Sequence, residues 1–283
     1  MKRQLINFLK IIRWKNVVIY ALLQVLLYFV FFKQTFQFHN GWFFLTLTMI
    51  FYGIFGNIQN NLADYELDSH KNDFIPFNKT AYTIILILLL IFALIFSFAS
   101  FYLTFHPTLL YAVLLVPVLL SGYNYFLKKT PLIGNLIIAF LTAFAIFIPI
   151  NYALSDVSFT KEQNELFRFL LILAFLLTLL REIAKDMEDK HIDKAFGYKT
   201  LPVIHTGLSK IIFILFSLIL AGTVWLLRNS ITDDINFYLL SGLILFCLIF
   251  SIKSIYDNKY KTATQILKLS MVIGYIILIF SQF

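Results

Sequence analysis

Long apolar runs, separated by short polar stretches, cover most of the chain. A helix needs about 20 mainly apolar residues to cross a bilayer, and nine runs approach that length. The predicted spans are residues 17–33, 42–62, 80–104, 107–127, 132–153, 166–184, 207–227, 236–256 and 264–282. The pattern predicts an all-α, polytopic integral membrane protein that forms a single membrane-embedded domain over residues 1–283.

The composition agrees with this class. Of the 283 residues, 60% are hydrophobic and 13% are charged, whereas a soluble domain carries roughly a quarter charged residues. The single cysteine, Cys247, lies inside an apolar run, which excludes an internal disulfide and a cysteine-based zinc site. Nothing in the composition requires a nucleic-acid partner.

Residues 1–16 form a separate, basic and amphipathic segment. Apolar positions such as Leu5, Phe8 and Leu9 alternate with Lys2, Arg3 and other cations. A signal peptide would need a shorter apolar core and a small-residue cleavage site. The segment is therefore predicted to be an interfacial helix that leads into the first span.

The distribution of positive charge predicts the topology. Four of the 23 Lys and Arg residues, namely Lys33, Lys161, Arg168 and Arg228, lie on one side of the nine predicted spans. The other 19 lie in the N-terminal segment and in the loops on the opposite side, which the positive-inside rule makes cytoplasmic. The excess of Lys and Arg in these cytoplasmic segments accounts for the net charge of +8. The N-terminus and the polar stretches 57–79 and 181–202 are predicted on the cytoplasmic side of the cell's inner membrane.

The stretch 181–202, REIAKDMEDKHIDKAFGYKTLP, carries five acids within twelve residues. On a helix Asp186, Asp189 and Asp193 fall at i, i+3 and i+7, so their side chains share one face. Three like charges on one stripe repel each other. A divalent cation removes that repulsion, because Mg²⁺ prefers carboxylate oxygens and commonly shares them with substrate phosphates.

A second stripe of oxygen ligands follows the second span. In NIQNNLADYELDSHKND, residues 57–73, the side chains of Asn60, Asp64 and Asp68 fall at i, i+4 and i+8. Both stripes lie at predicted cytoplasmic helix ends. They are expected to face one another and to hold two metal ions around a diphosphate.

These motifs resemble those of a known family. NNLADYELD is similar to the NDxxDxxxD signature of the UbiA superfamily of intramembrane prenyltransferases, and DMEDKHID is similar to its second signature, DxxDxxxD. The segment SGYNYFLKKTPLIGN, residues 121–135, resembles a third family feature, in which a Tyr precedes a Lys after span four. Here these are Tyr123 and Lys128. The order of spans and motifs extends the resemblance over essentially the whole chain.

The resemblance implies a fold, a reaction and a set of residue roles. The fold would be a UbiA-like helical bundle that encloses a polar cavity at the cytoplasmic side. Mg²⁺ would assist transfer of a polyprenyl group from its diphosphate to a lipophilic acceptor within the bilayer. The metal ligands and catalytic acids would be Asn60, Asp64, Asp68, Asp186, Asp189 and Asp193. The diphosphate would contact Lys128, Lys185, Lys199 and Arg181, and Tyr123 would orient the phosphate or the allylic cation.

The chain departs from the family pattern at two positions. Asn61 stands where the family usually has Asp, so the first stripe has one negative charge fewer. Ile75 stands where an Arg is common, so Lys71 or Lys79 would have to supply a basic phosphate clamp. Both departures affect the first stripe, and the second signature is intact.

Two alternatives remain open. Acids at loop positions are often merely solvated, and a non-catalytic transporter or assembly protein would also have many spans. Transporters, however, place ionisable groups near mid-membrane, whereas these acids lie at span ends. Within the enzyme class, the acceptor is either a glycerol-phosphate lipid, alkylated on oxygen, or an aromatic quinone precursor, alkylated on carbon. The flanks of the second signature favour the glycerol-phosphate lipid.

Overall fold

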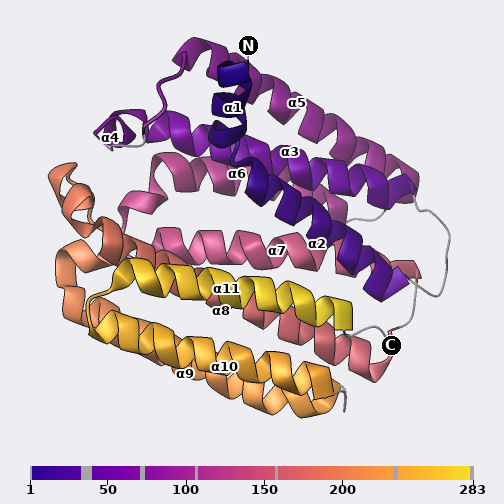
Figure 1. Cartoon of the computed structure of the whole chain (residues 1–283). Coiled ribbons are helices and arrows are strands. Elements are labelled where there is room, and N and C mark those ends of the chain that lie inside the picture. Colours follow the sequence, from indigo (N-terminus) through magenta and orange to yellow (C-terminus); the bar gives the residue numbers. More distant parts are fainter. Residues whose placement is uncertain are drawn as a thin grey trace. The chain divides into compact units, whose positions relative to one another are not determined.

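The computed structural model describes residues 2–32, 40–70, 74–105, 108–156, 159–231 and 235–280. These residues form α-helices and one short 3₁₀ helix, in the order shown in Figure 1. The chain divides into two compact units. The first contains Met1–Val25 and Gln34–Phe126, and the second contains Leu26–Lys33 and Leu127–Phe283.

The first unit is built on α3. It contains α1 (Lys2–Ile11), most of α2 (Trp14–Phe32), α3 (Asn40–Ala63), α4 (Tyr65–Asp68), α5 (Lys79–Thr104) and α6 (Thr108–Tyr125). Helix α3 packs along α5 and α6, and it also contacts α1. Ile11 and Ile12 join Phe55, Ile58 and Leu86 in a buried cluster that fixes the N-terminal segment to α3.

The second unit is built on α8. It contains η1 (Leu127–Lys129), α7 (Ile133–Asp156), α8 (Lys161–Ala195), α9 (Leu201–Ile231), α10 (Ile235–Tyr256) and α11 (Tyr260–Phe280). Helix α8 packs against α7, α9 and α11, while α10 packs against α9 and α11. Leu166, Leu179 and Leu180 are fully buried along α8. The helix that carries the second acidic stretch is therefore held by three neighbours.

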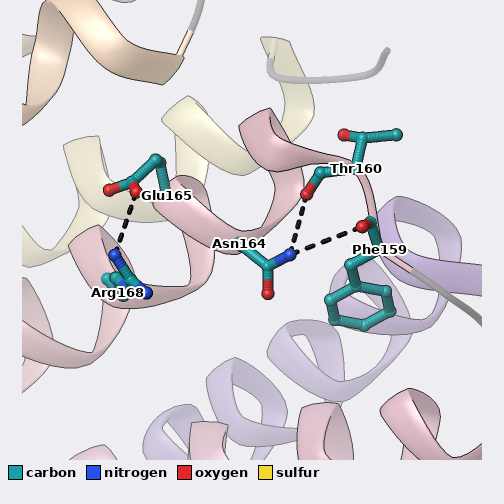
Figure 2. A network of polar contacts seen from close by, with 5 residues as sticks. All are labelled: Phe159, Thr160, Asn164, Glu165 and Arg168. Atoms are coloured by element: carbon teal, nitrogen blue, oxygen red, sulfur yellow. Dashed lines mark hydrogen bonds and ion pairs between the residues drawn. The ribbon is translucent and has the colours of Figure 1, made fainter.

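The start of α8 is fixed by polar contacts (Figure 2). Thr160 and Gln163 form a reciprocal capping box, in which each side chain bonds the other's main-chain N–H. The amide of Asn164 donates to the carbonyls of Phe159 and Thr160, and Arg168 pairs with Glu165 one turn later. The capping box satisfies the main-chain N–H groups of Thr160 and Gln163, since a helix start leaves its first N–H groups without helical partners.

A helix occupies each of the nine predicted spans, which confirms the all-α, membrane-spanning class. Within the described ranges, six helices are long and apolar enough to cross a bilayer, namely α2, α3, α5, α7, α9 and α10. The segments predicted as spans four, six and nine are helical in α6, α8 and α11. That all nine helices cross the bilayer stays a prediction.

Two predicted boundaries differ from the structure. The helix expected over residues 1–16 ends at Ile11, and α2 begins at Trp14, because Arg13 between them has a left-handed backbone with φ of 54°. The predicted sixth span ends at residue 184, but α8 continues without a break to Ala195. The second acidic stretch is therefore mostly helical, which agrees with the helical spacing of its three aspartates.

Candidate active site

The acidic stripe of the second unit lies on the last three turns of α8. Asp186, Asp189 and Asp193 belong to one uninterrupted helix, so the predicted spacing places them on a common face. Glu182, one turn before Asp186, extends this stripe. It is buried and forms an ion pair with Arg181.

The carboxyl group of Asp186 has a strongly shifted pKa. It is partly buried beyond the predicted end of its span, and Asn135 Nδ2 of α7 donates to its Oδ2 atom at 2.8 Å. Burial raises the pKa of Asp186 to about 7, and the neighbouring charges of Glu182 and Asp193 act in the same direction against the Asn135 hydrogen bond. A carboxylate in this setting is stabilised by a bound cation.

Asp193 is held by the loop that follows α8. Thr200 Oγ1 donates to Asp193 Oδ2 at 3.1 Å, and the main-chain N–H of Tyr198 donates to the Asp193 carbonyl at 2.9 Å. The chain can reverse here because Gly197 has a φ of 71°, which favours glycine. The flank GYKTLP therefore folds back onto the last acid of the stripe.

The turn that carries Lys128 belongs to the same unit as this stripe. The main-chain N–H of Lys199 donates to the Lys129 carbonyl at 3.0 Å, and Lys129 Nζ lies 5.1 Å from the centroid of the Tyr198 ring. Helix α7 starts close beneath the turn, since a Cβ atom on Gly134 would lie 2.8 Å from both the Leu127 carbonyl oxygen and Lys128 Cα. Lys128, Lys199 and the second acidic stripe are thus parts of one local structure.

The acidic stripe of the first unit crosses the junction of α3 and α4. Asn60 lies in the last turn of α3, Asp64 is the N-cap residue of α4, and Asp68 is the last residue of α4. The Asp64 N–H donates to the Asn60 carbonyl at 2.9 Å, and the Asp68 N–H donates to the Asp64 carbonyl at 2.7 Å. These two i+4 hydrogen bonds keep the three residues on one stripe although the helix is interrupted.

Asn57 and Asn61 have a different role from their neighbours. The amide of Asn57 donates to the Ile12 carbonyl at 2.9 Å, and the amide of Asn61 donates to the Ile11 carbonyl at 2.8 Å. Both acceptors lie at the C-terminal end of α1, where helix carbonyls lack helical partners. Aspartate cannot donate these bonds, which gives a physical reason for the departure from the family pattern at Asn61.

The presence of Ile75 where the family commonly has Arg also has a structural reason. Ile75 packs against the apolar cluster of α1, α3 and α5, a place that does not suit an Arg head group. Lys79 lies 3.8 Å from the Glu66 carboxylate and 4.3 Å from the centroid of the Tyr65 ring. Lys71, the other predicted replacement for the missing clamp, lies outside the described residues.

A buried polar cluster was missed at the sequence level. Asn124 on α6 donates to Gln59 on α3 at 3.0 Å, and Gln59 donates to Ser121 at 2.9 Å. Gln59 directly precedes Asn60, and Tyr123 directly precedes Asn124. Polar residues inside an apolar segment were the available signal, since such groups are buried only with partners.

The structure does not bring every predicted residue together in one unit. Tyr123 is on α6 in the first unit, whereas Lys128 is on η1 in the second. Within the described ranges, no three His, Cys, Asp or Glu side chains lie close enough together to hold a metal ion. Each stripe therefore offers a partial set of ligands.

The family assignment rests on most of the chain. The model of the UbiA prenyltransferase family matches residues 17–272. The chain belongs to this family. The resemblance found in the two acidic signatures is thereby confirmed.

Curated UbiA relatives match in sequence. Digeranylgeranylglyceryl phosphate synthase of Pyrococcus furiosus is 33% identical over 166 residues, which cover 56% of each chain. The enzyme of the same name from Methanothermobacter thermautotrophicus is 32% identical over 178 residues, or 61% of this chain and 60% of the relative. The aligned region thus spans little more than half of these relatives' length.

Solved UbiA structures share the fold over nearly the full length. A structure described as digeranylgeranylglyceryl phosphate synthase in membranes superposes with a TM-score of 0.74 at 21% identity, covering 99% of both chains. A UbiA homologue from Archaeoglobus fulgidus bound to GPP and Mg²⁺ gives a TM-score of 0.61 at 17% identity, covering 96% of this chain and 99% of that one. This protein therefore has the UbiA fold and is a multi-pass integral membrane protein.

Proposed function

We propose that this UbiA family member transfers a polyprenyl group from a polyprenyl diphosphate to the hydroxyl oxygen of a glycerol-phosphate lipid. The observation that carries the proposal is the pair of acidic stripes, one at the end of α3 and on α4, the other on the last turns of α8. Their family signatures support a role for both stripes in binding the donor diphosphate. The relatives named digeranylgeranylglyceryl phosphate synthase support the choice of a glycerol-phosphate acceptor.

The residues fit a hard divalent cation such as Mg²⁺. Asp186 lies near Glu182 and Asp193, which are also acidic, and its hydrogen-bond donor Asn135 is neutral. Mg²⁺ usually binds one or two carboxylates and completes its shell with water and substrate phosphates. A partial set of protein ligands on each stripe is therefore sufficient. Bound Mg²⁺ would neutralise charge on the departing diphosphate.

The remaining residues position the reactants. Lys128 and Lys199, joined through the η1 contact with the loop after α8, offer ammonium groups to the phosphate oxygens of the donor. Asn60, Asp64 and Asp68 complete the ligand set from the first unit, and Tyr123 orients the phosphate. The bond between the allylic carbon and the diphosphate oxygen breaks, and the acceptor oxygen forms the new bond to that carbon and loses its proton.

An apolar groove in the second unit suits the polyprenyl tail. It has a volume of about 460 Å³ and is lined by Phe140, Ala143, Phe144, Phe147, Leu171, Ile172, Phe175 and Leu176 of α7 and α8. Phe140, Phe144 and Phe147 form a stacked ladder with centroid distances of 5.3 and 5.9 Å. The groove shares α8 with Asp186, about 15 Å along the helix axis from Leu176. We place the active site on the cytoplasmic side, as the charge distribution predicts.

The proposal is tested with purified protein in lipid nanodiscs. Diphosphate release and lipid product are followed with geranylgeranyl diphosphate, geranylgeranylglyceryl phosphate and Mg²⁺. We expect Asp64→Asn and Asp189→Asn each to lower turnover on the order of 10² to 10³-fold. The matched control is Glu188→Gln, which changes an exposed acid of the same helix that lies off the stripe. Wild-type turnover in both stripe variants would refute the metal assignment, and wild-type diphosphate release without formation of the ether lipid would refute the acceptor.

A further inference from the structure

Helix α1 has an inner face that packs on its unit and an outer face that does not. Ile11, its last residue, and Ile12 are buried in the cluster with side chains of α3 and α5. Leu5 and Ile6 lie about 120° and 140° around the helix from Ile11, and they are 59% and 43% exposed. Packing within the first unit therefore leaves two large apolar side chains of α1 uncovered.

Exposed cations accompany this apolar pair. Lys10, four residues after Ile6, lies on the same side of α1, and Arg13 and Lys15 follow the end of the helix; all three are exposed. Their side chains form no hydrogen bond or ion pair with the part of the chain that the structure describes. Trp14, between the last two, is 43% exposed. Lys and Arg beside exposed Trp, Leu and Ile are typical of a helix at a membrane surface.

The first unit has too few acids to neutralise its cations. Helix α1 packs on α3 and shares its buried cluster with α5, and neither α3 nor α5 contains an acidic residue. The acids of the unit are Asp64, Glu66, Asp68 and Asp73, against seven Lys and Arg residues. Glu66 already pairs with Lys79. Even if every acid neutralised one cation, three cations would remain.

We propose that α1 docks on a surface of anionic phospholipid headgroups. The headgroups supply the negative charge that the unit lacks, and Leu5 and Ile6 enter the boundary between headgroups and acyl chains. A zwitterionic headgroup offers the same apolar boundary but no net charge. Each Lys or Arg held near an anionic surface strengthens the association about fivefold. Docking does not depend on which acceptor the enzyme alkylates.

Two hydrogen bonds connect the docked helix with the helix of the first acidic stripe. The amide of Asn61 donates to the Ile11 carbonyl at 2.8 Å. The amide of Asn57 donates to the Ile12 carbonyl at 2.9 Å. Asn60, the first member of the stripe, directly precedes Asn61. Attachment of α1 to headgroups restrains this end of α3, so turnover should depend on anionic lipid.

The docking is tested by hydrogen exchange of the whole chain in nanodiscs. One set contains phosphatidylcholine and the other phosphatidylglycerol with the same acyl chains. The amides of α1 should exchange about tenfold more slowly in phosphatidylglycerol, because docking opposes local opening of the helix. This difference should shrink at about 1 M salt, which screens the headgroup charge.

Two triple variants locate the effect. The α1 variant neutralises the exposed cations of this segment: Lys10→Gln, Arg13→Gln and Lys15→Gln. The matched control neutralises three exposed cations around the turn between α10 and α11: Lys253→Gln, Lys259→Gln and Lys261→Gln. The α1 variant should lose most of the difference in exchange between the two bilayers, and the control should keep it.

Turnover tests the connection to the acidic stripe. The rate of diphosphate release in phosphatidylglycerol, relative to phosphatidylcholine, should be about fivefold lower in the α1 variant than in the control. Effects of the bilayer on Mg²⁺ or on the donor are the same for both proteins. Asn57→Leu/Asn61→Leu should also lose the lipid dependence of turnover, while exchange in α1 stays slower in phosphatidylglycerol.

The outcomes separate docking from the proposed reaction. If phosphatidylglycerol protects wild-type α1 but no prenyl product forms, the proposed reaction fails and the docking surface stands. Equal exchange of α1 in the two bilayers would overturn the docking. Equal losses in both triple variants would assign the effect to surface charge in general. Protection of α1 by inorganic diphosphate in phosphatidylcholine, as strong as that by phosphatidylglycerol, would assign the cations to the donor.

Discussion

The side-chain amide of Asn61 donates a hydrogen bond to the main-chain carbonyl of Ile11, 50 residues earlier in the chain. The bond holds the end of α1 against the helix that carries Asn60. An Asp at this position would present oxygen to oxygen. Together with the bond from Asn57 to the Ile12 carbonyl, the Asn61 bond couples the N-terminal helix to the helix of the first acidic stripe.

The first prediction concerns this amide. Asn61→Asp should destabilise the protein by about 1 to 2 kcal/mol, because it removes a donor and places a negative charge beside a carbonyl. The drop should appear in thermal unfolding and in faster tryptic cleavage near Arg13. Asn78→Asp is the matched control, since the Asn78 side chain accepts from the Ala81 N–H at the start of α5, a role that Asp performs equally well. Equal losses of stability in Asn61→Asp and Asn78→Asp would contradict this role of the Asn61 amide.

The second prediction concerns pH and Asp186. Its folded-state pKa of about 7 lies above the usual 3.8, so between these values the folded, metal-free protein holds a proton that the unfolded chain has released. The contribution of Asp186 to stability is therefore present at low pH and is lost as pH rises from about 4 to 7. Asp186→Asn should flatten the fall in Tm over this range in the presence of a chelator.

The same proton competes with the metal. The concentration of Mg²⁺ that gives half-maximal diphosphate release should rise as pH falls below about 7, by up to about tenfold per pH unit. Asn135→Leu should move this dependence to higher pH, because the Asn135 hydrogen bond lowers the pKa of Asp186. If the Mg²⁺ concentration for half-maximal diphosphate release does not change between about pH 6 and 8, Asp186 is not a metal ligand.

The third prediction concerns Gly134. Gly134→Ala places a Cβ atom against the backbone of the η1 turn, and such overpacking costs about 1 to 3 kcal/mol. The turn that carries Lys128 must shift, so kcat should fall together with stability. Gly222→Ala is the control, because Gly222 lies within α9 with no atom within 4 Å of the added methyl group. That variant should be slightly more stable than the wild type.

The fourth prediction concerns donor length. Ala143→Phe fills part of the groove between α7 and α8, so kcat/KM for geranylgeranyl diphosphate should fall relative to that for geranyl diphosphate. Leu243→Phe, at an exposed position on α10, introduces a Phe side chain away from the groove and should leave the ratio unchanged. Equal losses for both donors in Ala143→Phe would mean that the tail lies elsewhere.

The sequence predicted the helices better than it predicted the roles of individual polar residues. Apolar periodicity and length locate a helix wherever about 20 apolar residues occur, and each of the nine predicted segments is helical. The end of α1 could not be predicted, because it depends on a left-handed backbone at Arg13 that no residue type requires. The end of the sixth predicted span did not locate the end of α8, since acidic residues after an apolar run mark where a span ends but not where its helix ends.

The acidic stripes were predicted because their spacing is a local property. The donors that orient the second stripe are Asn135 on α7 and Thr200 in the loop after α8, and only the folded structure identifies them. The difference between Asn60 and Asn61 shows the same limit. The two side chains are chemically identical, yet the amide of Asn61 donates to the carbonyl of Ile11 in α1. That contact depends on how α3 packs and not on residue type.

Helix α8 runs for 35 residues, or about 50 Å, from the predicted sixth span into the acidic stripe without an intervening hinge. A change in the thickness of the surrounding bilayer, which spanning helices answer by tilting, would be transmitted as a rigid-body movement to the carboxylates. The positions of the carboxylates would therefore depend on the fatty-acyl length of the host membrane.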